Sequence, residues 1–316
     1  MRRLPLTPIN GISALTNLFS AGRSQKLFSN VLILLALATL LPSLAQAYDI
    51  LVLQSRRDAG YEEALKGFRN GLSASQRTIV LSSFAEVDVA RIVREDRPRV
   101  ILAVGDAAMA AARKVQQTPV IAVMALGIGP QHNLTGVTMF APPERYCNLF
   151  HLMKVRRVGI IHNPARTGRY LRQARQEAEK AGIELVVREV SSPRETLAQL
   201  SLLAGKVDAL WMLPDITAVT RETTEAYFRF GQDQNIPVIS FAGSYLGLGA
   251  AAVVEIDRTE LGRQAADMAA GLLGGATVDV MPFRNPRGTT YKTNSAVLKK
   301  FGLTIDEINK LNQFKD

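Results

Sequence analysis

The chain has 316 residues, of which 47% are hydrophobic and 21% charged, the balance of a globular protein with a sizeable core. Its formal net charge of +10 includes four basic residues within positions 1–47, a stretch without Asp or Glu. The remaining basic residues alternate with Glu along helical patterns, which argues against the one-signed patch that a nucleic-acid partner requires. The single cysteine, Cys147, excludes an intrachain disulfide.

The N-terminus has the pattern of a secretory signal peptide. Basic residues precede VLILLALATLL (31–41), which is shorter than the roughly 20 residues that cross a bilayer. PSLAQA (42–47) follows, with Ala45 and Ala47 as the small residues of a cleavage site. We therefore predict cleavage after Ala47 and export to the periplasm. A short buried helix or an uncleaved anchor is the alternative.

Strand-like and helical patterns then alternate along the chain. Short apolar runs rich in β-branched residues form a first series at 49–54, 78–82, 99–104 and 119–124, and a second at 157–162, 183–188, 208–213, 237–241 and 251–256. Such continuous runs are typical of strands buried on both faces of a parallel sheet. Helical patterns lie between them, at 61–72, 106–117, 167–182, 221–234 and 260–275. The sequence predicts an α/β fold with two doubly wound parallel-sheet lobes joined by a hinge.

The ends of these strands are candidate ligand contacts. In open parallel sheets, ligands bind beyond the carboxyl ends of the strands. The residues at those ends are Gln54, Ser55, Gly105, Asp106, His162, Asn163, Ser240 and Phe241. VGDAAMAA (104–111) also has the order strand, glycine, helix N-terminus, whose free N–H groups suit a carboxylate or phosphate oxygen.

Asp215 ends an otherwise apolar stretch. In ALWMLPDITAVT (209–220), Pro214 cannot extend the strand, so Asp215 lies on the loop where a ligand would bind. Asp is also a preferred N-cap, and a helical pattern follows. The sequence leaves two roles open: capping alone, or ligand contact with or without capping.

Patterns of catalysis and metal binding are missing from the sequence. His132, His151 and His162 lack metal-ligand spacing, and neither a nucleophile elbow nor a Walker loop occurs. His162 at a strand end has either a ligand role or a hydrogen-bonding one. Cys147 lies four residues before His151 on an apolar helical face, with no third group to orient the pair. We expect no enzymatic activity, no metal and no cofactor.

Several segments in order carry a resemblance to a known family. They are NLTGVT (133–138), VGIIHNP (158–164), KVDALWMLPD (206–215), IPVISF (236–241), EIDRTELGRQAADMAAGLLGG (255–275) and KTNSAVLKKFGLTI (292–305). Together they resemble the ABC-transporter substrate-binding proteins that bind tryptophan or other aromatic amino acids. The resemblance implies a type I periplasmic-binding-protein fold. It also implies ligand contacts from strand-end loops, at Gln54, Ser55, Gly105, Asp106, Ala107, Asn163 and Asp215.

One segment departs from the family pattern. Relatives carry an Asp-Pro loop and a short helix before the TG motif, whereas this sequence has ALGIGPQH (125–132). The resemblance therefore does not fix the solute as an amino acid. Arg56 and Arg57, in the loop after the first strand, either meet a ligand carboxylate or remain exposed to solvent.

We expect an exported protein that closes around a small solute, an amino acid or similar, and delivers it to a membrane permease as a monomer. A sensory module feeding a signalling receptor is the alternative, and an enzyme on the same fold is the third hypothesis. The expected division is a signal peptide at 1–47, lobe 1 at 48–138 plus 250–276, lobe 2 at 139–249 plus 277–291, and a C-terminal helical segment near the hinge at 292–316.

Overall fold

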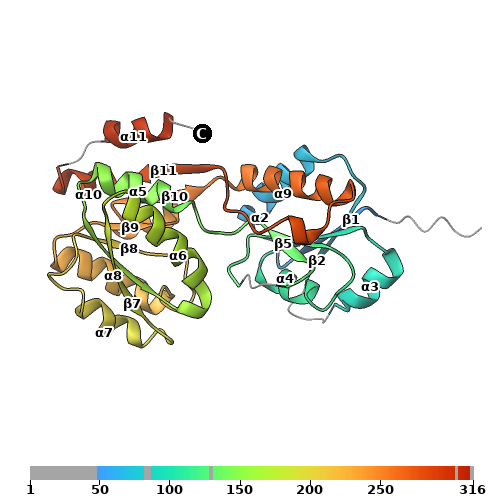
Figure 1. The fold of residues 1–316 in the computed structure, drawn as a ribbon, viewed down its shortest axis with the longest axis horizontal. Coiled ribbons are helices and arrows are strands. Elements are labelled where there is room, and N and C mark those ends of the chain that lie inside the picture. Colours follow the sequence, from blue (N-terminus) through green and yellow to red (C-terminus); the bar gives the residue numbers. More distant parts are fainter. Residues whose placement is uncertain (1–47, 82–86, 128–130, 303–304, 314–316) are drawn as a thin grey trace, which may run out of the picture. The chain divides into compact units, whose positions relative to one another are not determined.

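The computed structural model describes residues 48–81, 87–127, 131–302 and 305–313, which fold around two separate β-sheets (Figure 1). The predicted signal peptide and part of the segment 125–132 lie outside the described residues. None of the helices in the described ranges is long and apolar enough to cross a membrane.

The first sheet is fully parallel and has the strand order β2-β1-β3-β4-β5. Its strands are β1 (Ile50–Gln54), β2 (Gln76–Val80), β3 (Val100–Val104), β4 (Val120–Val123) and β5 (Leu134–Gly136). Apolar side chains pack against α2 (Ala59–Gly71) and α9 (Arg258–Leu273) on one face. The other face packs against α3 (Val89–Asp96) and α4 (Asp106–Ala112).

The second sheet has the order β11-β10-β9-β8-β6-β7 and is parallel except for β11. Its strands are β6 (Arg157–His162), β7 (Glu184–Glu189), β8 (Ala209–Trp211), β9 (Val238–Ser240), β10 (Ala252–Ile256) and β11 (Thr289–Thr293). One face carries α5 (Pro143–Leu152), α6 (Pro164–Lys180), α10 (Ser295–Lys300) and α11 (Ile305–Gln313). The opposite face carries α7 (Glu195–Ser201) and α8 (Arg221–Asp233).

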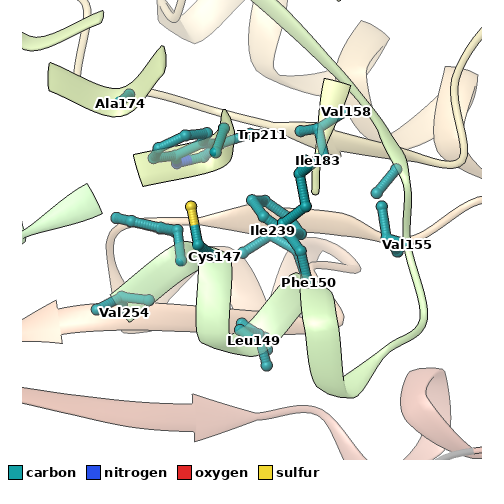
Figure 2. Close-up of a cluster of buried hydrophobic side chains, with 14 of the residues drawn as sticks. Cys147, Leu149, Phe150, Val155, Val158, Ala174, Ile183, Trp211, Ile239 and Val254 are labelled. Atoms are coloured by element: carbon teal, nitrogen blue, oxygen red, sulfur yellow. The ribbon is translucent and has the colours of Figure 1, made fainter. Parts of the chain in front are cut away.

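Trp211 lies at the centre of the core between the second sheet and α5. Its side chain is fully buried, and its ring lies 4.5 Å from that of Tyr146 between centroids. Figure 2 shows Cys147, Phe150 and Ile239 in the same cluster of apolar side chains. The only tryptophan of the chain therefore reports on the folding of this core by its fluorescence.

The predicted α/β architecture with two doubly wound sheets is confirmed, and each of the predicted strands is present. Two further strands, β5 and β11, were not predicted: β5 has three residues, and β11 is a partly exposed edge strand. Burial on both faces is wrong for the edge strands β2 and β7, whose residues are exposed or half-buried. An edge strand has a neighbour on one side, so less of it is covered.

Two parts of the expected division into lobes are wrong. Residues 250–276 were assigned to the first lobe, but β10 pairs with β9 in the second sheet, and only α9 packs on the first. Residues 277–291 are expected in the second lobe, but of these only 289–291 lie in its sheet, as part of β11. Met281 accepts from Thr135 of β5, and the backbone of Arg284 bonds to those of Gly136 and Thr138. The chain thus passes between the sheets after β5, between β10 and α9, and before β11.

Two glycines bring α2 and α9 into direct backbone contact. A Cβ on Gly262 would lie 1.9 Å from the carbonyl oxygen of Ala64, and one on Gly67 would lie 1.9 Å from that of Thr259. No real Cβ tolerates such a distance. Glycine at these positions is therefore required for α9, which follows a strand of the second sheet, to pack on the first.

We predict that Gly262→Ala lowers the free energy of unfolding by about 1–3 kcal/mol, because the two helices must separate. Urea denaturation followed by far-ultraviolet circular dichroism measures the change. Gly168→Ala is the matched control, because this position in α6 has open space around it and should gain about 0.5–1 kcal/mol. Equal stability of wild type and Gly262→Ala would contradict the proposed role of the contact.

Candidate functional site

Each sheet contains one switch point, a pair of neighbouring strands whose following helices pack on opposite faces of the sheet. In the first sheet it lies between β1 and β3, and in the second between β6 and β8. The order of the second sheet from β7 to β10 repeats that of the first from β2 to β5. Ligands of doubly wound sheets bind in the crevice at such points, beyond the carboxyl ends of the strands.

The predicted contacts of the first sheet meet at its switch point. Ser55 follows β1, and its Oγ accepts a hydrogen bond of 2.8 Å from the backbone N–H of Ala108 in α4. Its own N–H donates to the carbonyl of Val104 at the end of β3 (2.9 Å). Ser55 therefore fastens the two strand-end loops together and brings Asp106 and Ala107, both exposed, beside the end of β1.

Gly105 is held in a conformation that favours glycine. Its φ is +88°, and a Cβ there would lie 2.5 Å from the hydroxyl oxygen of Tyr61 and 2.6 Å from Ser55 Oγ. The close approach places Tyr61 at the switch point, a residue that sequence reasoning did not select. Burial raises the pKa of its phenol. The only sequence signal for Tyr61 is its position early in the helix after β1.

The other polar side chains of this half are already hydrogen-bonded within the protein. Asp106 accepts from the backbone N–H groups of Leu126 (3.0 Å) and Gly127 (2.7 Å) and so holds the loop after β4. Gln54 is buried, and its amide donates to Glu62 (2.9 Å). These contacts fix the shape of the loops.

Arg56 and Arg57 differ in their surroundings. Arg56 donates to Asp58 at 3.2 Å and lies over the ring of Tyr61, 5.3 Å from its centroid. Arg57 is exposed. Contact of either arginine with a ligand stays a prediction.

Asp215 joins the loops at the switch point of the second sheet. One carboxylate oxygen accepts from the N–H of Asn163 (2.8 Å) and the hydroxyl of Thr167 (2.9 Å). The other accepts from the N–H groups of Thr217 (2.9 Å) and Ala218 (3.1 Å). The residue is 2% exposed, so both oxygens are used inside the protein.

The expectation that Asp215 caps the following helix is wrong. α8 begins at Arg221, and its N-cap is Thr220, which forms a capping box with Thr223. Asp215 instead closes the preceding turn, since its own carbonyl accepts from the N–H of Val219 (2.8 Å). Its carboxylate also supports the N-cap of α6, Asn163, whose side chain accepts from Ala165 (2.9 Å) and donates to Thr217 (3.2 Å).

His162 is linked to the same carboxylate through Thr167. Its Nδ1 lies 3.0 Å from Thr167 Oγ1, and the Thr167 hydroxyl donates to Asp215. Since that hydroxyl has one proton, Nδ1 carries the hydrogen that it donates to Thr167. Burial lowers the pKa of the imidazole, and the Asp215 carboxylate opposes this shift. His162 is 2% exposed, which gives it a hydrogen-bonding place in the network.

Phe241 and Cys147 lie outside these networks. Phe241 follows β9, half-buried, with its ring 5.2 Å from that of Tyr245. Cys147 is buried in the core of the second sheet (Figure 2), and burial raises the pKa of its thiol to about 11. Such a thiol is a core side chain rather than a nucleophile. The described residues contain no group of three or more metal-ligating side chains.

Two doubly wound sheets of matching strand order define a type I periplasmic-binding-protein fold. A model of the ABC transporter substrate binding protein family matches residues 50–313, and the chain belongs to this family. Its members bind small ligands as parts of ABC transporters and are typically found outside the cytoplasm. The family is one of solute-binding proteins rather than enzymes, as the sequence predicts.

Solved structures and one curated relative are similar to the chain. A Streptococcus pneumonia ABC domain in complex with L-Trp is 20% identical, with a TM-score of 0.59, and the match covers 83% of this chain and 97% of that one. The ligand-free, open structure of a Clostridium difficile substrate-binding protein with adhesive properties is 19% identical, with a TM-score of 0.60 and coverage of 81% and 95%. A tyrosine-binding protein of Clostridioides difficile is 24% identical over 174 residues, 54% of this chain. The chain thus spans about half (50%) of that relative's length.

We predict that Asp215→Ala lowers the free energy of unfolding by roughly 2–4 kcal/mol, because it leaves buried donors at the start of α6 and in the loop after β8 without an acceptor. Urea denaturation followed by Trp211 fluorescence measures the change. Asp233→Ala is the control, since Asp233 is exposed on α8. Similar stability of the two variants would show that the network does not hold these loops.

Proposed function

We propose that the protein is exported, closes around a small solute at its two switch points, and delivers that solute to the permease of an ABC transporter. The observation that supports this most directly is the repeated arrangement of the two sheets. Each brings polar residues of two strand-end loops together at its switch point, with Ser55 joining them in one sheet and Asp215 in the other.

In this proposal the solute contacts the strand-end loops that carry the predicted residues. These are Gln54, Ser55, Gly105, Asp106, Ala107, Asn163, Asp215 and Phe241. Side chains with protein partners, such as Asp215, contribute by holding the loops in shape. A ligand that touches the loops of both sheets shifts the population toward a closed form, which the permease binds.

The solute is an amino acid or a molecule of similar size in this proposal. The relatives that bind tyrosine or are solved with L-Trp make aromatic amino acids the first probes. The altered segment 125–132 makes a wider panel necessary, because it follows β4 at the same edge of the sheet.

We expect a thermal-shift screen of the exported protein to find a solute among aromatic and other amino acids, nucleosides, short peptides and organic acids. Asn163→Asp should then weaken its binding at least about tenfold in calorimetric titration. The substitution keeps the N-cap acceptor but replaces the amide donor by a charge at the switch point.

Asn294→Asp is the matched control for this experiment. Asn294 also caps a helix, α10, but it follows the antiparallel strand β11, whose carboxyl end lies at the opposite edge of the sheet. Binding should be unchanged in this variant. Equal losses in the two variants, or a panel without any stabilising compound, would argue against the proposed site.

We expect the exported protein to begin at Tyr48. The basic, apolar and small-residue segments of 1–47 support cleavage after Ala47. Intact-mass spectrometry of the periplasmic fraction measures the N-terminus. A full-length chain recovered from membranes would refute cleavage.

A further inference from the structure

A cavity of about 500 Å³ lies beside the segments that pass between the two sheets. Its walls come from the start of α5, the start of α9 and residues 287–290, the last two of which begin β11. None of these residues belongs to the switch points. The volume is that of a site for a small molecule.

Arg145 is the unusual residue of this cavity. Its guanidinium lies over the ring of Tyr291, 4.3 Å from the centroid, and the Tyr291 hydroxyl donates to the Arg145 carbonyl (2.8 Å). Its Nε is buried without a hydrogen-bond partner. Across the described residues, no carboxylate lies within ion-pair distance of Arg145. The stacking orients a planar donor group that has no carboxylate partner in the part of the chain that the structure describes.

The other arginines of the cavity already have carboxylate partners. Glu260 accepts from Arg263 (2.6 Å) and from Arg287 (2.5 Å). Arg287 also pairs with Asp267 (2.8 Å), and Asp257 caps α9 by accepting from the N–H of Glu260 (3.0 Å). Among the three arginines that line the cavity, Arg145 is therefore the one without a carboxylate partner in the described part of the chain.

We propose that this cavity is a second binding site, which takes a small monocarboxylate through Arg145. A carboxylate matches the two parallel donors of a guanidinium. The side chains of Glu144, Asp257 and Glu260 also line the cavity and repel a second negative charge. This favours a singly charged carboxylate over phosphate. The site does not depend on the solute proposed for the switch points.

Calorimetric or saturation-transfer NMR titration of the exported protein tests this with propionate and inorganic phosphate as probes, in a buffer free of other carboxylates. We expect propionate to bind more tightly than phosphate. Arg145→Gln should weaken propionate binding at least tenfold. Glu144→Gln should strengthen it a few-fold, because the exposed Glu144 carboxylate then no longer repels the ligand.

Two control variants locate the binding. Arg172→Gln removes an exposed arginine of α6, and Asn163→Asp alters the switch point; both should leave propionate affinity unchanged. Melting curves identify any variant that fails to fold. If Arg145→Gln does not fold, Glu144→Gln still tests the site, because it should strengthen propionate binding. The proposal is overturned if propionate does not bind, if phosphate binds more tightly, if folded Arg145→Gln binds as wild type does, or if Glu144→Gln fails to strengthen binding.

Discussion

The strand order of the two sheets is the constraint on which the candidate site depends. Between β1 and β3, and between β6 and β8, the connections that follow the two strands leave toward opposite faces of the sheet. The two strand-end loops at each of these points are linked by a hydrogen bond. A single side chain provides this link in each sheet. Ser55 accepts from the N-terminus of α4, and Asp215 accepts from the first residue after β6. In both sheets, a side-chain oxygen that accepts from a backbone N–H therefore links the two segments at the switch point.

Local patterns predict the strands well but not their partners. Buried parallel strands such as β3 are continuous apolar runs, so their type follows from the sequence alone. The position of β10 in the second sheet does not follow from the sequence, because nothing in the residues of β10 indicates that it pairs with β9. The contact of α9 with α2 depends on Gly67 and Gly262, which are distant in sequence and look like weak points of a helix. Such long-range contacts caused the errors in the expected division.

The positions of the candidate site follow from topology, whereas the roles of its residues do not. Strand ends can be located from the sequence, and several of the predicted residues do meet at the two switch points. Two of the four bonds of Asp215 come from Asn163 and Thr167, about 50 positions earlier, which no local pattern connects to it. The true N-cap of α8 did have a local signal, the threonine pair Thr220 and Thr223, which fits a capping box better than Asp215.

The engaged polar side chains also bear on how a solute would be bound. Asp106 through Oδ1, Asp215 and Ser55 accept hydrogen bonds from backbone N–H groups of neighbouring segments. The loops are therefore ordered by folding, and a ligand does not have to order them when it binds. Arg145 shows the opposite arrangement, since the protein orients its guanidinium by stacking but supplies no anion within the described residues. Donors held in place without an acceptor are available to a ligand, and in this respect Arg145 differs from Arg263 and Arg287, the arginines of the same cavity that have carboxylate partners.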